Sequence, residues 1–367
     1  MKEMNALELH CLLKELNVLV GGKIDQIYQP EKKELLLSFH IPSVGKKILR
    51  IKVPNYLYLT EFKEGMPETP ADYCIFLRRR LENARLREIS QKGFERVVEF
   101  AFEKAESKFY LIIELFSKGN VILCDDKHMI ISPLEIQKWK DRTIMPKLPF
   151  KFPQRENNFL TLTFEELNSI TEKSDKENIV KTIAIELGLG GAYAEELCLM
   201  AGIDKSKKKI DDKEVKSLFR AVEAMRSRDI KPCIYGDTIT PFEMLRHKGE
   251  ACETAASYNE ALDRVLSVEK KGEIREKGDS AYQKKVAELK RIISQQELKV
   301  KQIEAGIDED KKKGELIYEN YQKIDLLLKE MKKAREKHSF KEIKEILKNS
   351  KLVREINEKD KTVTIDL

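Results

Sequence analysis

The sequence predicts an α+β protein with an N-terminal domain of two antiparallel sheets and helices, followed by a helical domain and a long charged helix. Short strand-like segments separated by turn residues fill residues 23–135. Apolar residues return to helical spacing at about residues 163–266, and beyond about residue 280 they alternate spacings of three and four. We therefore expect domains at residues 1–160, 161–268 and 269–367.

A helix is expected at residues 5–20, where leucines recur at helical spacing. Asn5 and Glu8 have the spacing of a capping box, with Asn5 as the N-cap residue and Glu8 as the carboxylate that bonds back to the N-cap amide. The acidic residues of this segment distinguish it from a secretory signal peptide. No apolar run approaches the roughly 18–20 residues of a membrane span, so a cytoplasmic protein is expected.

Two groups of predicted strands surround a helix at about residues 70–81, with Thr69 as its cap and Pro70 in its first turn. Two antiparallel sheets joined by this helix follow from that order. Pro146, Pro149 and Pro153 mark a linker after the strands. The expected strand segments are KIDQIYQP, ELLLSFHI, KILRIKV, YLYLTEF, LREISQ, RVVEFAFE, KFYLIIELF, NVILCDD and MIISPLE.

Glycines at 188, 190 and 191 lie in a segment, residues 184–194, that matches the helix-hairpin-helix pattern. Glycine allows the backbone conformations that such a hairpin needs, and it lets a phosphate approach the amides at the start of the second helix. Gly188, Gly190 and Gly191 are therefore candidate backbone contacts for phosphate. A tight turn between two helices with no ligand is equally typical of this pattern.

A coiled-coil seam is expected beyond residue 280, and it weakens at Asp310 and Gly314. One apolar stripe needs a second helix, which we expect from a returning arm later in a longer protein or from another subunit. The strand-like end VTIDL also suggests that the protein continues. The seam residues are Val286, Leu289, Ile293, Gln296, Val300, Ile303, Ile307, Ile317, Tyr321, Ile324, Leu328 and Met331.

Positive charge exceeds negative charge by only six, 69 Lys and Arg against 63 Asp and Glu, so a polyanionic partner is permitted but not required. Arg78, Arg79 and Arg80 end the predicted helix at 70–81. Cations there complement the helix dipole, but three successive arginines point in different directions and also suit phosphate. The segments Lys92–Arg96 and Glu114–Asn120 are typical of ordinary turns.

Catalytic and cofactor-binding patterns are not found in the sequence. The five histidines are scattered, no phosphate-binding loop or dinucleotide fingerprint is present, and no metal site or cofactor is expected. The six cysteines form no CxxC pair, so buried thiols in a reducing compartment are expected. They are Cys11, Cys74, Cys124, Cys198, Cys233 and Cys252.

Several segments together resemble the NFACT ribosome-quality-control family, which includes RqcH and NEMF and was once named for fibronectin binding. They are ADYCIFLRRRLENARL, QKGFERVVEF, LIIELFSKGNVILCDD, ELGLGGAYAEELCLMAGID, SYNEALDRVLS, GELIYENYQKI and KDKTVTIDL. They follow the family's order through nearly the whole chain.

This resemblance implies an N-terminal domain similar to formamidopyrimidine-DNA glycosylases, a helix-hairpin-helix domain and a coiled coil. It also implies binding to a stalled large ribosomal subunit that holds peptidyl-tRNA, and recruitment of tRNA, in prokaryotes alanyl-tRNA, for template-free tailing. The tailing chemistry belongs to the ribosome, so the implied role is tRNA positioning and not catalysis.

The resemblance also assigns residues. The family's Asp-Arg pair falls on Glu95 and Arg96, and its early aspartate falls on Glu8, where helix capping competes with an RNA role. Glu114, Lys118 and Asn120 match the family's hairpin, with Ser117 where glycine is usual. The expected tRNA and rRNA surface comprises Arg78, Arg79, Arg80, Lys92, Arg96 and Lys118.

Two alternatives accompany this interpretation. A glycosylase-like protein that binds DNA or a DNA lesion is one, although Lys2 and Glu3 follow Met1 where such enzymes use an N-terminal proline and a glutamate. Cell-surface adhesion follows only from the family's older name, and the N-terminal segment does not resemble an export signal.

Overall fold

The computed structural model describes residues 3–63, 66–140, 142–153, 155–339, 342–343, 345, 353–357 and 362–366, with the side chains of 273, 275–281 and 356 outside that description. It divides into two compact units, Met1–Arg275 and Glu276–Leu367. Among the described residues, no helix has both the length and the apolar character that crossing a membrane requires.

Helix α1 (Ala6–Leu16) begins with the capping box that the sequence predicts. The Asn5 side chain accepts a hydrogen bond from the Glu8 amide at 2.9 Å, and the Glu8 carboxylate accepts one from the Asn5 amide at 3.0 Å. The helix ends at Leu16, and a short 3-10 helix, η1 (Asn17–Leu19), replaces the expected last turn. The leucine face of α1 is buried, so the helix packs on the core.

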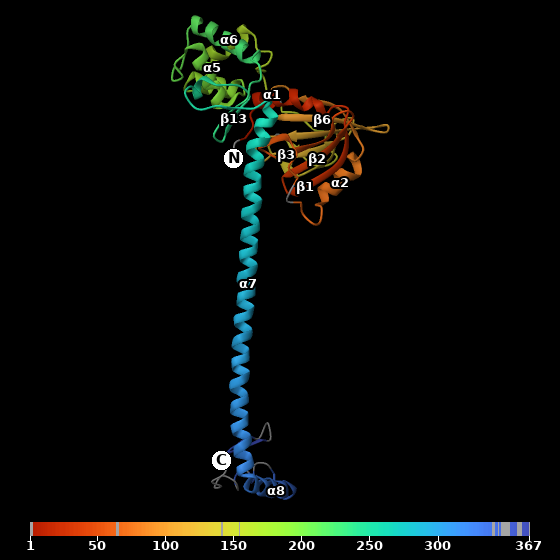
Figure 1. Ribbon diagram of the computed structural model, residues 1–367, viewed down its shortest axis with the longest axis vertical. Coiled ribbons are helices and arrows are strands. Elements are labelled where there is room, and N and C mark those ends of the chain that lie inside the picture. The colour runs from red at the N-terminus through yellow and green to blue at the C-terminus, as the bar shows by residue number, and fades with distance from the viewer. Residues whose placement is uncertain are drawn as a thin grey trace. The chain divides into compact units, whose positions relative to one another are not determined.

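The central element is one antiparallel sheet of nine strands, in the order β4-β3-β2-β1-β5-β6-β7-β8-β9 (Figure 1). The strands are β1 (Lys23–Glu31), β2 (Glu34–Ile41), β3 (Gly45–Lys52), β4 (Tyr56–Thr60), β5 (Arg85–Gln91), β6 (Val97–Lys104), β7 (Ser107–Glu114), β8 (Asn120–Cys124) and β9 (Ile130–Pro133).

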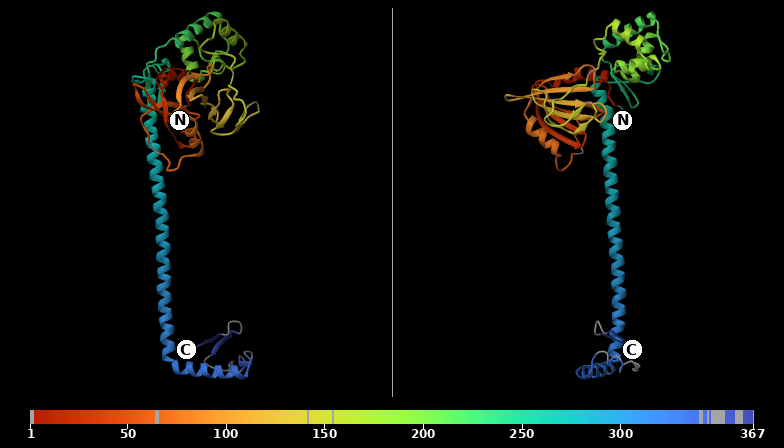
Figure 2. Two further views of the ribbon diagram at one scale, coloured as in Figure 1. Left: turned by 90° about the vertical axis from the view of Figure 1, so that its right-hand side faces the viewer. Right: turned by 180° about the vertical axis from the view of Figure 1, so that it is seen from behind.

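The expectation of two separate sheets is therefore wrong, because the two groups of strands are joined into one. Strands β1 and β5 meet at a single residue pair, Lys23 with Arg85, and backbone hydrogen bonds such as Ile24 N–H to Ala84 O extend the junction. These amides would otherwise lack partners in the interior. The two halves still pack face to face, since Phe39 of β2 stacks on Phe102 of β6 at 6.3 Å and the sheet bends around this core (Figure 2).

Helix α2 (Asp72–Leu81) begins two residues later than the sequence predicts. Ala71 is the N-cap residue and makes no side-chain cap, so Thr69 does not cap the helix. The reason is that the backbone at Ala71 is still extended, with φ −67° and ψ 153°. Asp72 supplies the negative charge that favours the first turn.

Four helices form a second core beside the sheet domain: α3 (Phe164–Lys173), α4 (Ile179–Glu186), α5 (Gly190–Ala201) and α6 (Asp212–Arg226). In Figure 1, α5 and α6 lie in a group apart from the labelled strands β1, β2, β3 and β6 of the large sheet. Three residues of the N-terminal domain belong to this same core, namely Ala6, Leu7 and Phe94. The helical group is thus packed directly against α1 and the turn that precedes β6.

Two of the six cysteines are not free thiols, contrary to expectation. Cys233 and Cys252 form a disulfide, with 5.5 Å between their Cα atoms. Pairing of β12 (Cys233–Tyr235) with β14 (Glu253–Thr254) brings them together, and β13 (Thr238–Thr240) completes this small sheet. A 3-10 helix, η2 (Leu245–His247), lies between β13 and β14. The other four cysteines are free and buried.

Helix α7 (Tyr258–Glu319) begins well before residue 280. The Glu15 carboxylate accepts hydrogen bonds from the amides of Tyr258 and Asn259 at 2.8 and 2.7 Å, and the Ser257 hydroxyl accepts one from the Glu260 amide at 3.1 Å, so α1 and Ser257 together cap α7. The Asn259 side chain bonds the N–H and C=O of Leu59, at 2.6 and 3.0 Å, and so covers part of the edge strand β4.

The second unit contains the remainder of α7, helix α8 (Tyr321–Lys337) and the paired strands β15 (Val353–Asn357) and β16 (Thr362–Ile365). The strand-like end of the chain is thus confirmed as a strand. Most α7 side chains of the expected seam are exposed, for example Ile293 at 52% and Ile303 at 54%, while Val286 is half-buried. The expected seam does not lie on a single helix, however, because α7 ends at Glu319 and the last seam residues, Tyr321, Ile324, Leu328 and Met331, belong to α8.

Candidate nucleic-acid interface

The turn at residues 92–96 joins β5 to β6 and is held firmly in place. Phe94 inserts into the helical core with 2% of its surface exposed. The Gln91 side chain donates to the carbonyl oxygens of Ala6 and Glu95, both at 3.0 Å. Because Phe94 points inward, Lys92, Glu95 and Arg96 lie around the outside of a fixed loop.

Each charged residue of this turn has one partner of opposite charge. Lys92 lies 2.6 Å from Glu99, and Arg96 lies 2.6 Å from Glu3. The lysine and arginine side chains remain 34% and 29% exposed. Arginine carries five N–H donors in a fixed fork, so Arg96 retains donors for a phosphate while it is paired with Glu3.

Arg155 connects this turn to the helical domain, and sequence reasoning missed it. Its Nε lies 2.9 Å from the Glu95 carboxylate, and its Nη1 donates to the Ile185 carbonyl at 2.6 Å, at the end of α4. A lone arginine in a proline-containing linker carries no local signal, because its partners lie 60 and 30 residues away.

The glycine segment between α4 and α5 lies directly against Arg155. Gly188 has φ +68°, which favours glycine, and a Cβ there would lie 2.5 Å from Nη1 of Arg155, so the guanidinium would have to shift to admit a side chain. Gly190 has φ +70°, and a Cβ there would meet nothing within 4 Å. A Cβ at Gly191 would likewise meet nothing within 4 Å. The N-cap residue of α5 is Leu189, whose side chain cannot accept a hydrogen bond. The first amides of α5 therefore have no side-chain cap.

A second turn, residues 115–119, lies at the same edge of the sheet, since the Leu115 amide donates to the Arg96 carbonyl at 2.8 Å. Lys118 is exposed, and its carbonyl accepts a hydrogen bond from Lys33. Asn120 is buried, and its side chain bonds the backbone C=O and N–H of Glu135 at 2.8 and 3.2 Å. Of the expected hairpin residues, Lys118 is thus on the surface and Asn120 supports the turn.

Glu114, at the end of β7, is buried and forms an ion pair with Arg142. Burial raises the pKa of the Glu114 carboxyl above its usual value, and Arg142 opposes that shift. Glu114 therefore holds Arg142 in position from the interior of the domain and is not itself on the surface.

Glu8 is also buried, with 2% of its surface exposed. The Tyr193 hydroxyl of α5 donates to the Glu8 carboxylate at 3.1 Å. Together with the capping box, this contact makes Glu8 a link between α1 and α5. An indirect role, through the placement of α5 beside the 92–96 turn, fits this position better than contact with RNA.

Comparison with known proteins decides the family. Residues 5–367 match the family described as NFACT N-terminal and middle domains. The chain belongs to the NFACT family. The resemblance inferred from its sequence segments is confirmed.

Relatives of this NFACT chain include the archaeal Rqc2 homolog aRqcH of Methanocaldococcus jannaschii, 31% identical over 97% of this chain and 57% of the relative. The human ribosome quality control complex subunit NEMF is 24% identical over 90% of this chain and 34% of its own length. The chain thus spans about a third to somewhat over half of these relatives.

Among solved structures, the N-terminal part of the fibronectin/fibrinogen-binding protein from Streptococcus suis has the same fold. Its TM-score is 0.60 at 23% identity, over 72% of this chain and 99% of that one.

The arginine triplet of this NFACT chain lies apart from the 92–96 turn. Arg78 donates to the Ile27 carbonyl at 2.7 Å, while Arg79 and Arg80 are exposed. Lys104, the last residue of β6, reaches the Arg79 carbonyl, whereas Arg96 precedes the first residue of β6. An eight-residue strand is roughly 25 Å long, so the expected cations form two separate groups.

Within the ranges that the structure describes, no three His, Cys, Asp or Glu side chains come together as a metal site would require. The site offers charge and hydrogen bonding, through the guanidinium and ammonium groups of the 92–96 turn and the first amides of α5, which have no side-chain cap. Both kinds of donor suit phosphate oxygens.

Proposed function

We propose that this chain is the N-terminal part of a ribosome-quality-control factor that binds tRNA on a large ribosomal subunit holding stalled peptidyl-tRNA. It recruits tRNA, in particular alanyl-tRNA, for template-free tailing of the stalled chain. The tailing reaction takes place at the ribosomal peptidyl-transferase centre, so this protein positions tRNA in the cytoplasm and catalyses no step. The names of its relatives support the ribosome-quality-control role.

The observation that carries the RNA-binding part is the connection from Glu95 through Arg155 to Ile185. It places the charged turn and the glycine segment side by side on fixed elements. Backbone amides at Gly190 and Gly191 and the cations Lys92 and Arg96 then contact phosphates of one RNA molecule. Such contacts read the shape of the RNA and not its base sequence.

The exposed seam of α7 fits the same proposal. A returning helical arm, supplied by the longer protein, pairs with this apolar stripe in a coiled coil. The 92–96 turn and the glycine segment both lie in the unit Met1–Arg275, so RNA binding by this part can be tested without that arm.

The test compares binding of this chain to tRNA and to lesion-containing duplex DNA at matched salt. We expect tRNA to be preferred and its affinity to fall steeply as salt rises. Arg96→Ala weakens tRNA binding by about 1–3 kcal/mol if the contact is charge-assisted. Lys271→Met, a change at an exposed lysine of α7, is the matched control and leaves the affinity unchanged.

A preference for the duplex, or strand cleavage, would instead support the glycosylase-like alternative. That alternative is weakened by Glu3, because its carboxylate is engaged by Arg96 at 2.6 Å. An unchanged dissociation constant for Arg96→Ala at low salt removes Arg96 from the interface.

A further inference from the structure

The only tryptophan of the chain lies on a small surface hairpin that no motif singles out. The hairpin consists of β10 (Gln137–Lys138) and β11 (Thr143–Ile144). Trp139 follows β10, and its amide donates to the Arg142 carbonyl at 2.8 Å. The Trp139 side chain is 37% exposed, so part of the indole faces solvent while the rest is covered.

The segment that carries this ring is rich in positive charge, and Arg142 is the cation placed beside the ring itself. Residues 137–151 contain five cations and one acid, Asp141, which lies outside the described residues. All four lysines of this segment are exposed, and none forms an ion pair with a described residue. They are Lys138, Lys140, Lys147 and Lys151.

Arg142 fixes the geometry of the hairpin. It pairs with the buried carboxylate of Glu114, and its guanidinium lies 4.8 Å from the centre of the Phe150 ring. The same guanidinium lies 6.0 Å from the centre of the Trp139 ring. A shallow hollow beside it is lined by Lys140, Arg142, Thr143, Leu148, Pro149 and Lys151.

The hairpin is anchored and adjoins the proposed RNA surface. Ile144 and Phe150 are buried in a third core with residues of β6, β7 and β8. The Gln137 side chain donates to the Gly119 carbonyl at 2.9 Å, next to Lys118. The tryptophan therefore lies at the sheet edge that carries the 115–119 and 92–96 turns.

We propose that Trp139 stacks on an unpaired base of an RNA strand whose phosphates contact Lys140, Arg142 and Lys151. This inference rests on the proposed function for the identity of the partner as RNA. A base inside a duplex has both faces covered by its neighbours, so only an unpaired base offers a face to the indole. Every base can stack on an aromatic ring, and nearby cations contact the phosphates of the RNA backbone.

Charge favours RNA over other partners for this surface. The centres of protein interfaces are depleted in lysine, whereas the segment that contains Trp139, residues 137–151, exposes four lysines. A lipid surface would require a broader apolar face than Trp139 offers with the nearby Ile136 and Leu148.

The experiment uses the intrinsic fluorescence of Trp139, which reports on this hairpin alone because no other tryptophan is present. A ten-nucleotide RNA of mixed sequence is titrated into the chain, first single-stranded and then annealed to its complement. We expect saturable quenching by the single strand and much weaker quenching by the duplex at equal phosphate concentration.

Three variants separate stacking from burial of apolar surface. With a labelled oligonucleotide, Trp139→Phe retains affinity within about threefold, while Trp139→Leu and Trp139→Ala weaken it roughly tenfold. Because most of the Trp139 side chain is covered, Trp139→Ala and Trp139→Leu should lower the melting temperature somewhat, so binding is measured well below the lowest melting temperature of the set. Equal binding by Trp139→Leu, equal quenching by the duplex, or a larger spectral shift with anionic phospholipid vesicles would each overturn the proposal.

The same samples distinguish the two proposals. If the single strand quenches Trp139 but tRNA binding is weak and insensitive to Arg96→Ala, the hairpin assignment stands and the proposed function fails. If tRNA binds in an Arg96-dependent manner while Trp139 is neither quenched nor needed, the hairpin assignment fails alone.

Discussion

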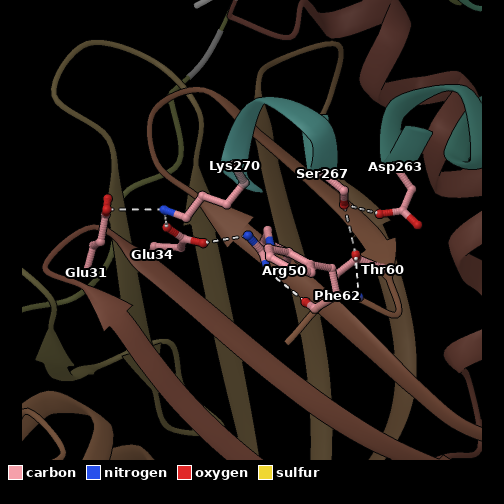
Figure 3. A network of polar contacts seen from close by, with 8 residues as sticks. All are labelled: Glu31, Glu34, Arg50, Thr60, Phe62, Asp263, Ser267 and Lys270. Carbon is pink, nitrogen blue, oxygen red and sulfur yellow. Dashed lines mark hydrogen bonds and ion pairs between the residues drawn. The ribbon is translucent and has the colours of Figure 1, made fainter. Parts of the chain in front are cut away.

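The ammonium of Lys270 in α7 lies 2.7 Å from the carboxylate of Glu34 in β2, although 236 residues separate the two in the sequence (Figure 3). The other Glu34 oxygen accepts a hydrogen bond from Arg50 at 3.0 Å, and Glu31 lies 3.1 Å from Lys270. Burial alone would lower the pKa of Lys270, but Glu34 and Glu31 outweigh burial and raise it. The first part of α7 is therefore joined to the sheet by charges that persist at neutral pH.

This network predicts unequal costs for its two partners. Glu34→Gln leaves Lys270 and Arg50 buried without their shared carboxylate, and should lower the free energy of unfolding by about 3–5 kcal/mol. Lys270→Met leaves Glu34 paired with Arg50, so the loss should be about 1–3 kcal/mol. Urea unfolding followed by Trp139 fluorescence measures both.

Lys271→Met is the control for that comparison. Lys271 is exposed, and its ammonium lies 5.1 Å from the Phe62 ring, so its loss should cost less than about 1 kcal/mol. Similar losses for Glu34→Gln and Lys270→Met would show that Glu34 is not the shared acceptor on which the network depends.

The two glycines with positive φ at the junction of α4 and α5, Gly188 and Gly190, should differ in their tolerance of substitution. Gly190→Ala meets only backbone strain, about 1 kcal/mol, because nothing lies within 4 Å of the added Cβ. Gly188→Ala has the same strain and also a contact of 2.5 Å with Arg155, so it should cost more. Adding Arg155→Ala should recover the steric part of that loss in thermal unfolding. No recovery would mean that the backbone conformation alone requires Gly188.

Gly191→Glu separates stability from RNA binding. The new carboxylate lies in the first turn of α5, where it favours the helix dipole, and replacing glycine in a helix removes a penalty of up to about 1 kcal/mol. The melting temperature of Gly191→Glu should equal or exceed that of the unchanged protein. Its tRNA affinity should fall, because the new carboxylate repels the RNA phosphates. Gly191→Gln, which adds the same bulk without charge, should reduce affinity less. Unchanged tRNA affinity for Gly191→Glu would exclude the start of α5 from the interface.

Acid should destabilise the N-terminal domain through His10. Burial, and then the nearby Lys14 ammonium, lower the pKa of His10 below 6.5. The unfolded chain therefore binds a proton at this residue more readily than the folded chain, so the free energy of unfolding falls as pH drops below about 6.5. His10→Gln should reduce the slope between pH 7.5 and 5.5, by at most about 1.4 kcal/mol per pH unit. Identical slopes would contradict this assignment.

Local sequence signals predicted what is locally determined. The capping box of Asn5 and Glu8, the strands before residue 135 and the glycine turn between two helices each depend on residues within a few positions. Arg96 and Lys118 could also be named, because they fall in turns of segments that resemble the NFACT family.

Contacts between distant segments could not be predicted in this way. The single residue pair that joins the two halves of the sheet, the Cys233–Cys252 disulfide and the Arg155 bridge all depend on how separate elements meet. The separation of Arg78 from Arg96 likewise follows from the length of β6, which sequence composition does not reveal. Trp139 had a usable signal, one tryptophan among five cations, but no family motif drew attention to it.

The carboxylate of Glu15 and the amides that it caps are made at very different times. A ribosome adds Tyr258 243 residues after Glu15, so the acceptor is already available when its donors emerge. Starting a helix is the costly step, and here a folded surface offers the first hydrogen bonds from outside the helix. A detached peptide beginning at Ala256 would keep the local Ser257 cap but lack the acceptor for the amides of Tyr258 and Asn259, and its first turn would fray more than in the folded protein.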